Sequence, residues 1–326
     1  MTRNPFTVLL GLGMLLIGGA SPAAAQMDAP HMPTGPAGAC TIVGPLLGPS
    51  DFGVAAGQPV ADMSAIVLPD GRIRMYMFAQ GKGIVSAVSV STDGASFTAE
   101  SGVRLPDGSG MPRVVANPAG GYRLFFISAG GIKSATSTDG LTFTIENGFR
   151  ITADAAGFGA ATAGGATSGP TVIRLADSRY RMYFSDLPRP GDTPGSHRVK
   201  SAVSADQLTW TVEDGIRIGP GASVLTESAE HPFALPNPDG SVTVYYGKFT
   251  GPGTAAVEGL YHSTSIDGLT FAQEGYDVLF GNDPDALRLS DGTLLLYYGQ
   301  FDSQIGGTIN LARCPDPTAA AAAARK

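Results

Sequence analysis

The apolar positions of the chain form short runs that repeat in a fixed order. Each repeat has an apolar run, a polar turn, an aromatic-rich run, a third run that ends in Ser-x-Asp, and a Phe or Trp that leads into a fourth run. Short runs of this kind, separated by Gly, Pro, Asn and Asp, are typical of β-strands. Beyond the first 25 residues, no segment sustains the 3.6-residue apolar period of a helix. The Ser-x-Asp turns lie in the segments 91–97, 137–143, 204–210 and 265–271.

The repeats predict a ring-shaped fold. Four strands per repeat, with repeats about 45 to 65 residues apart, are typical of the blades of a β-propeller. Four copies are complete, and a fifth, between Ala286 and Ala312, has only three strands. We therefore expect an all-β protein, a five-bladed β-propeller with four-stranded antiparallel blades.

The first residues have the three-part pattern of a secretory signal. Arg3 precedes an apolar run over 6–17, and the small residues over 18–25 end in Ala-Ala-Ala. The apolar run is shorter than the roughly 20 residues that a transmembrane helix needs. We therefore predict a signal peptide over 1–25 and a secreted or periplasmic protein. The propeller is expected over 40–314, between disordered segments at 26–39 and 315–326.

The missing strand of the fifth copy is predicted to come from the other end of the chain. The segment 40–47 is a strand without a repeat of its own, and it can complete the fifth blade and remove an open sheet edge. Cys40 would then lie beside Cys314. Two cysteines placed this way in an exported chain indicate a disulfide, and the chain-entropy estimate for so long a loop is about 4 to 5 kcal/mol. The alternative is a pair of free thiols.

The aspartates of the Ser-x-Asp turns are predicted to be structural. Asp and Ser side chains cap tight turns, and a following Gly accepts a positive φ. A group that is repeated four times around a ring indicates architecture, because a catalytic group is usually unique. This assignment covers Asp93, Asp139, Asp206 and Asp267.

The composition narrows the classes of partner. Charged residues make up 15% of the chain, and its formal net charge is −7. Nucleic acids and anionic membranes bind basic surfaces, so we expect neither as a partner. We also expect a monomer. No nucleotide, zinc or Ser-His-Asp motif occurs in a fitting context. We therefore expect no cofactor and no catalytic metal, and leave open a structural cation in the central channel.

The central funnel is the predicted place for chemistry. The innermost strand of each blade starts at the channel, so the residues at that position converge from all five blades. Five short motifs hold this position, several of them with a proline, which can stand there without the loss of a ladder hydrogen bond. The ionisable residues of these motifs are Asp62, Arg113, Glu230, His231 and Asp283.

These motifs resemble those of the five-bladed furanosidase-like glycoside hydrolases, the superfamily of families 43, 32 and 68. In these families a carboxylate opens the first blade in an Asp-Pro-like motif, which Asp62 matches. A general-acid glutamate opens the fourth blade as Glu-x-Pro, which Glu230 and Pro232 match. A third carboxylate opens the third blade, where this chain has Gly169. The resemblance covers the blade pattern of the whole chain after the signal and departs at this one carboxylate, which in family 43 orients the acid and tunes its pKa.

The resemblance implies the hydrolysis of a glycosidic bond in a poly- or oligosaccharide. This reaction needs one protonated carboxyl to donate to the leaving oxygen and one ionised carboxyl to activate water or attack. Glu230 would be the acid and Asp62 the base or nucleophile. Arg113, His231 and Asp283 would bind the substrate, and Asp283 could also replace the carboxylate that the third blade lacks.

Several alternatives remain. The same carboxylates could cap the inner strands of a non-catalytic propeller that binds glycan or protein, and Glu227 could be the acid in place of Glu230. His197 ends an insertion over 187–197 that could overhang the funnel. His262 and the tyrosine pairs at 245–246 and 297–298 are expected to pack within strands. The Ser-x-Asp-Gly turns also resemble the Asp boxes of sialidases, but no arginine triad or nucleophilic tyrosine can be assembled.

Overall fold

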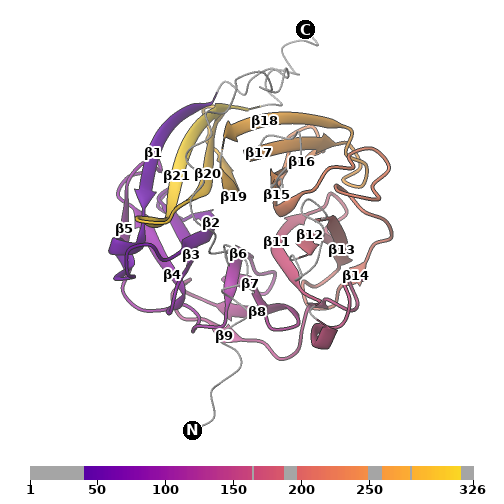
Figure 1. Ribbon diagram of the computed structural model, residues 1–326, viewed down its shortest axis with the longest axis horizontal. Coiled ribbons are helices and arrows are strands. Elements are labelled where there is room, and N and C mark those ends of the chain that lie inside the picture. Colours follow the sequence, from indigo (N-terminus) through magenta and orange to yellow (C-terminus); the bar gives the residue numbers. More distant parts are fainter. Residues whose placement is uncertain (1–39, 164, 187–196, 249–258, 280, 317–326) are drawn as a thin grey trace, which may run out of the picture.

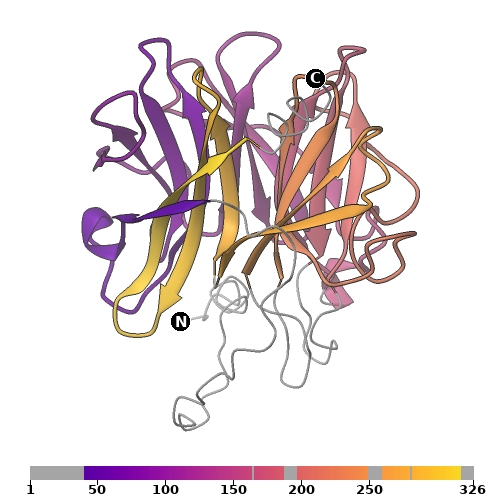
Figure 2. The same cartoon turned by 90° about the horizontal axis from the view of Figure 1, so that it is seen from above.

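The chain folds into five antiparallel β-sheets that stand around one axis. The structure is a computed structural model, and it describes residues 40–163, 165–186, 197–248, 259–279 and 281–316. Within these ranges each sheet is one blade of a propeller (Figure 1), and Figure 2 shows the blades from the side. The predicted all-β, five-bladed fold is confirmed. The predicted signal peptide and the segment 26–39 lie outside the described residues.

Successive stretches of chain supply the first four blades. The first blade contains β2 (Val60–Val67), β3 (Ile73–Ala79), β4 (Gly83–Ser89) and β5 (Phe97–Ala99). The second contains β6 (Gly110–Ala116), β7 (Tyr122–Ser128), β8 (Gly131–Ser137), β9 (Thr144–Ile145) and β10 (Ile151–Thr152). The third contains β11 (Thr167–Arg174), β12 (Tyr180–Asp186), β13 (Val199–Ser204) and β14 (Thr211–Val212). The fourth contains β15 (Glu230–Pro236), β16 (Val242–Lys248), β17 (Gly259–Ser265) and β18 (Gln273–Leu279).

The fifth blade joins the two ends of the described chain. It contains β19 (Asn282–Arg288), β20 (Thr293–Asp302), β21 (Gly306–Pro315) and, as its outer strand, β1 (Thr41–Leu47). β1 pairs antiparallel with β21, and a disulfide joins Cys40 to Cys314. The predicted ring closure and disulfide are therefore confirmed. The described residues end at Asp316, which forms an ion pair with Arg288 of β19.

The inner strands include the funnel motifs. β2 starts at Val60, before the Asp62 motif, and the pairing register shifts between Ala61 and Ser64. β6, β11, β15 and β19 have the same register shift at the equivalent place. Each funnel motif is thus a β-bulge inside its strand rather than a cap in front of it. A bulge tolerates proline because one of its residues stays outside the hydrogen-bond ladder.

The Ser-x-Asp turns join neighbouring blades, as the turn at Asp139 shows. Its carboxylate accepts the N–H groups of Leu141 and Thr142, both at 2.8 Å. Donors of the preceding blade then reach the turn's carbonyl groups, with the Tyr76 hydroxyl 2.8 Å from Gly140 O. The hydroxyls of Tyr183 and Tyr297 repeat this bond to the turns of the next blades, at Gly268 and Gly94. The predicted structural role of these aspartates is confirmed.

Tyrosines and phenylalanines fill the space between the blades. Tyr245, Tyr246, Tyr297 and Tyr298 are all buried, as predicted. Edge-to-face contacts join a strand aromatic of one blade to the aromatic that follows the next turn, as for Tyr183 and Phe271. The inner strands of adjacent blades contact one another around the whole ring. Among the described residues, no helix is long and apolar enough to cross a membrane.

Candidate functional site

Five residues with left-handed backbone surround the mouth of the channel, one from each blade. Their φ angles are +58° at Asp62, +48° at Met111, Gly169 and His231, and +50° at Asp283. Non-glycine residues rarely adopt this region, and four of them do so at the same position of the repeat. The left-handed conformation is therefore a regular feature of the fold. Each is the first of the two central residues of its inner-strand bulge, and a proline follows in four of the five blades. The bulges therefore aim five non-equivalent side-chain positions at a common space.

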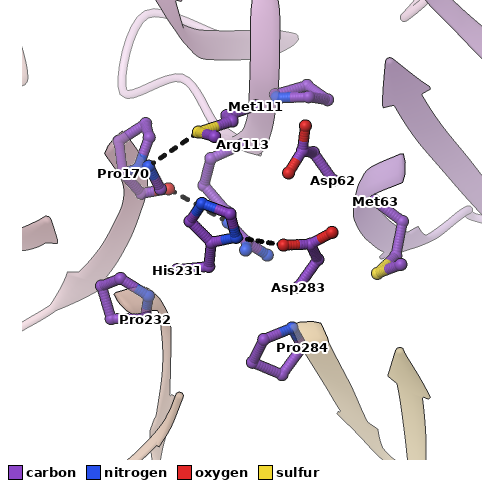
Figure 3. A pocket seen from close by; sticks show the side chains of 11 residues that line it. Asp62, Met63, Met111, Arg113, Pro170, His231, Pro232, Asp283 and Pro284 are labelled. Atoms are coloured by element: carbon purple, nitrogen blue, oxygen red, sulfur yellow. Dashed lines mark hydrogen bonds and ion pairs between the residues drawn. The ribbon is translucent and has the colours of Figure 1, made fainter. Parts of the chain in front are cut away.

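These positions line a small pocket at the channel mouth that is open to solvent. Figure 3 shows the Asp283 carboxylate directed at the His231 ring, with Asp62 on the neighbouring wall. Four of the five predicted funnel residues are brought together here. The pocket is lined by Asp62, Met63, Met111, Pro112, Arg113, Gly169, Pro170, His231, Pro232, Asp283 and Pro284.

The polar half of the pocket comes from blades one, four and five. His231 Nδ1 contacts Asp283 Oδ1, and Asp283 also shares a hydrogen bond with the Asp62 carboxyl. Ligand atoms of these three residues lie within 4.8 Å of one another, and they are the group of described residues that could hold a metal ion. The three side chains thus form one continuous polar cluster, in which a proton or a cation has to offset the two carboxylates.

Burial and mutual charge shift the pKa values of this cluster. Burial, reinforced by the nearby Asp283 carboxylate, raises the pKa of Asp62 to about 8. Burial alone would lower the pKa of His231, but Asp283, Asp62 and Glu230 outweigh it and raise that pKa to about 10. Burial also raises the pKa of Glu230, against the opposing charges of His231 and His197. Near neutral pH the site therefore combines a protonated Asp62 with an imidazolium at His231.

The other half of the pocket is apolar. Met111 and the prolines of blades two, three and four form this wall. The Met111 sulfur is held in place, because Ser168 Oγ and Gly169 N lie 3.0 and 3.2 Å from it as hydrogen-bond donors. The pocket therefore has one apolar wall and one charged wall.

Arg113 lines the pocket, but its side chain is bonded to other groups of the protein. Its guanidinium forms an ion pair with the fully buried Asp285, and its Nε donates to Pro170 O at 3.3 Å. It also lies 4.6 Å above the centre of the Phe233 ring. Asp285 accepts the Ala65 N–H at 3.1 Å, so this pair links blades two, three and five to blade one. Burial raises the pKa of Asp285 to about 6, although Arg113 opposes the shift.

Glu230 lies beside the pocket without being one of its lining residues. It is the first residue of β15, it is buried, and its neighbour His231 lines the pocket. The alternative acid Glu227 is exposed and forms an ion pair with the buried Lys248. His197 is buried, and its Nδ1 lies 3.7 Å from Asp186 Oδ1. Its backbone N–H donates to Ser228 Oγ at 3.1 Å. The rest of the predicted insertion, 187–196, lies outside the described residues.

Sequence reasoning missed Asp285 and Met111. Asp285 stands two residues after Asp283, as Arg113 stands two residues after Met111, so the repeat itself held a signal that this position pairs across the ring. Met111 has the same place in its blade as Asp62 and His231 but carries no ionisable group, and it was therefore not singled out. His262 is confirmed as a strand histidine, with its Nδ1 2.8 Å from Asp277 Oδ2.

Solved structures with this fold include several carbohydrate-active enzymes. A thermostable family-43 glycoside hydrolase superposes with a TM-score of 0.60 at 13% identity, over 78% of this chain and 89% of that chain. An endo-1,4-β-xylanase from Bacteroides thetaiotaomicron VPI-5482 gives 0.58 at 15% identity, over 78% and 90%. An endo-arabinase from the same organism gives 0.56 at 15% identity, over 83% and 96%.

No protein-family model matches the sequence, and a comparison with curated proteins gives no match. At identities of 13–15% the structural likeness establishes the fold. The resemblance to the five-bladed propeller glycoside hydrolases, first drawn from the motifs, is thus confirmed in three dimensions at the level of the fold.

Proposed function

We propose that this protein is a glycoside hydrolase that cleaves a poly- or oligosaccharide in the funnel pocket. The observation that carries the proposal is the convergence of Asp62, His231 and Asp283 on one pocket at the channel mouth, with Glu230 directly beside it. Solved structures with this fold include a family-43 glycoside hydrolase, a xylanase and an arabinase. A shared fold does not establish an activity, so the proposal depends on the carboxyl groups of the site.

Glu230 is the proposed general acid. Its burial favours the protonated form, which is the form that donates a proton to the leaving oxygen of a glycosidic bond. Asp62 is the proposed base or nucleophile, acting in its ionised form. Burial and the Asp283 carboxylate disfavour that form, whereas the positive charge of His231 favours it. Asp62 therefore acts in those molecules in which its carboxyl has lost the proton that burial favours.

The remaining funnel residues bind and shape. Asp283 and His231 present polar groups to sugar hydroxyls, and the wall at Met111 offers a contact for the apolar face of the ring. We assign Arg113 to holding the pocket wall, since its guanidinium is already bonded to Asp285. The carboxylate that related enzymes have in the third blade is replaced by Asp283 of the fifth blade, which contacts the same cluster.

The test is a screen of the secreted protein on aryl glycosides and on arabinan, xylan and fructan. We expect Glu230→Gln to lower kcat by at least about 100-fold, because the group that protonates the leaving oxygen is lost. Glu227→Gln, a change three residues earlier in the same segment, is the matched control and should retain activity. Equal activity of wild type and Glu230→Gln would refute the assignment of the acid.

A non-catalytic propeller that binds glycan is the alternative. In that case glycan binding, measured by calorimetry, would occur without turnover of any substrate in the screen, and Glu230→Gln would bind as well as the wild type. Binding together with turnover that requires Glu230 would exclude it.

We propose that the protein works outside the cytoplasm as a monomer. The Cys40–Cys314 disulfide supports this location, because such bonds persist in oxidising compartments. Fractionation of cells that express the full chain, followed by mass determination of the exported protein in solution, tests both points.

A further inference from the structure

We propose that Asp62, His231 and Asp283 form a binding site for a divalent first-row transition ion, Zn²⁺ or Mn²⁺. The proposal goes beyond glycoside hydrolysis and does not depend on it, because metal binding is measured without any sugar. It rests on the geometry of the three side chains, on the charge that they bring together, and on the types of their donor atoms.

The spacing of the donor atoms fits a single ion. The three ligand atoms lie within 4.8 Å of one another. Ligands bound at roughly 2.0 to 2.2 Å from one tetrahedral ion are about 3.3 to 3.6 Å apart, and around an octahedral ion they are about 3 Å apart when adjacent and about 4.2 Å apart when opposite. An ion bound here would replace the direct contact of His231 with Asp283 by bonds from both side chains to the ion.

The backbone holds these residues in place. Each belongs to the bulge of an inner strand, and the three strands β2, β15 and β19 stand in adjacent blades. β19 contacts both of the other two strands. Ligands on rigid, mutually packed strands are positioned before the ion arrives, which is the property of a metal site rather than of a flexible charged surface.

The cluster also offers groups from which a divalent ion can displace protons. His231 contacts Asp283, and Asp283 contacts Asp62, so two carboxylates meet with one imidazole. The nearby guanidinium of Arg113 does not offset them, because it is paired with the buried Asp285. A divalent ion in the middle of the three side chains would let both carboxylates bind it in ionised form.

Asn282 supplies a second observation at the same place. Its Nδ2 lies 3.2 Å from His231 Nδ1, and its Oδ1 is buried without a hydrogen-bond partner among the described residues. The two ends of an amide have the same shape and can exchange places by rotation. After that rotation Asn282 would turn its oxygen toward His231, where it can serve as a further ligand or orient a bound water.

The donor types select the ion. Carboxylates alone suit Mg²⁺ and Ca²⁺, whereas an imidazole in the set favours Zn²⁺ and its neighbours, and Mn²⁺ accepts both kinds of donor. Three protein ligands at the wall of a pocket also leave a coordination position for water or a ligand, as in catalytic zinc sites. We therefore expect Zn²⁺ and Mn²⁺ to bind more tightly than Ca²⁺ or Mg²⁺.

Calorimetric titration of the tag-free, disulfide-bonded protein with each of the four ions tests the proposal. EPR of Mn²⁺ reports the same site independently. The variants are His231→Ala and Asp283→Asn, each first checked for cooperative thermal unfolding. The matched control is His262→Ala, since His262 also pairs with an aspartate, Asp277, but belongs to none of the groups of described residues that could hold an ion.

The expected result is one Zn²⁺ or Mn²⁺ per chain, with an affinity that falls about 100-fold or more in His231→Ala and Asp283→Asn and is unchanged in His262→Ala. If His231→Ala unfolds, the folded Asp283→Asn variant decides. The proposal is overturned by the absence of binding at millimolar ion, by equal binding to the variants and wild type, or by tighter binding of Ca²⁺ than of Zn²⁺ and Mn²⁺. None of these outcomes depends on whether the protein hydrolyses a glycoside.

Discussion

Gly169 occupies a position that tolerates no side chain. Its φ is +48°, and a Cβ built there would lie 2.7 Å from His231 Cα and 3.1 Å from Pro232 Cδ. The first neighbour is backbone and cannot rotate away. The backbone of the fourth blade at His231 therefore leaves no room for a side chain at this position of the third blade.

Gly169→Ala should lower the free energy of unfolding by about 2 to 4 kcal/mol, through the left-handed backbone and the clash with His231. Gly240→Ala is the control, since that glycine also has a positive φ but nothing within 4 Å of its Cβ position. It should lose about 1 kcal/mol, for the backbone alone. Urea unfolding measures both values, and equal losses would contradict the steric argument.

At this scale the sequence predicts where ionisable groups stand but not what they contact. Asp62, His231 and Asp283 stand at the same position of their repeats, and the sequence therefore predicts that they meet in the funnel, where they line one pocket. Arg113 was not predicted to pair with Asp285, because the two residues lie in blades that are far apart in sequence, and their equivalent places in the repeat were the signal for the pair. The burial of Glu230 likewise depends on packing that its motif does not encode.

The Ser-x-Asp turn shows how one element works as a joint between blades. The third-blade copy has Gln207 in place of glycine, with φ at +63°. The preceding blade has Phe125 where its neighbours have tyrosine, so no hydroxyl competes for the turn. The Gln207 side chain accepts a hydrogen bond from Arg123 at 3.0 Å and donates one to Ala116 O at 3.1 Å. The two substitutions compensate for each other across the blade boundary.

Acidification should weaken the Ser-x-Asp turns and the contacts that they make between blades. Backbone N–H groups lower the pKa of Asp267 to about 2, and the same bonds lower the pKa of Asp139 and Asp206. Because these pKa values lie below the unfolded value, each carboxylate stabilises the fold above about pH 4, and that stability is lost as the pH falls toward 2. Thermal unfolding between pH 7 and 2 should show the loss, and Asp267→Asn should reduce its steepness. The same pH dependence in this variant as in the wild type would count against the turn as its source.

Elements were predicted well where their signal is local. The turns and the order of strands follow from Ser-x-Asp-Gly and from the alternation of apolar runs. The bulges were not predicted, because a proline follows the left-handed residue in four of the five motifs, and a proline equally marks the start of a strand. The strand pairing resolved this ambiguity by continuing on both sides of the motif.

The molecule as a whole is a ring whose closure depends on its two ends. β1 is the outer strand of a sheet that otherwise comes from the last part of the described chain. This closure could be predicted because the fifth repeat is one strand short and each end carries a cysteine. The separation of the pocket into a polar and an apolar wall could not be predicted, because it depends on how five sheets pack around one axis.

Replacing Cys40 and Cys314 by serine should lower the free energy of unfolding by about 2 to 5 kcal/mol, because the reduced unfolded chain gains the freedom that the closed loop denies it. Guanidinium unfolding of the variant and of the oxidised wild type measures the difference. The wild type after reduction is the control and should match the variant. Equal stability of oxidised and reduced wild type would show that the pairing of β1 with β21 closes the ring without help.

The pairing of β1 with β21 also sets the order of events during folding. A chain made from its N-terminus presents Thr41 to Leu47 first, yet the partner strand, Gly306 to Pro315, is the last to be completed. Four blades can therefore assemble while the fifth is still open and β1 is without a partner. Contacts between such distant segments form slowly, so the final step of folding is also the step at which two chains could exchange their first strands.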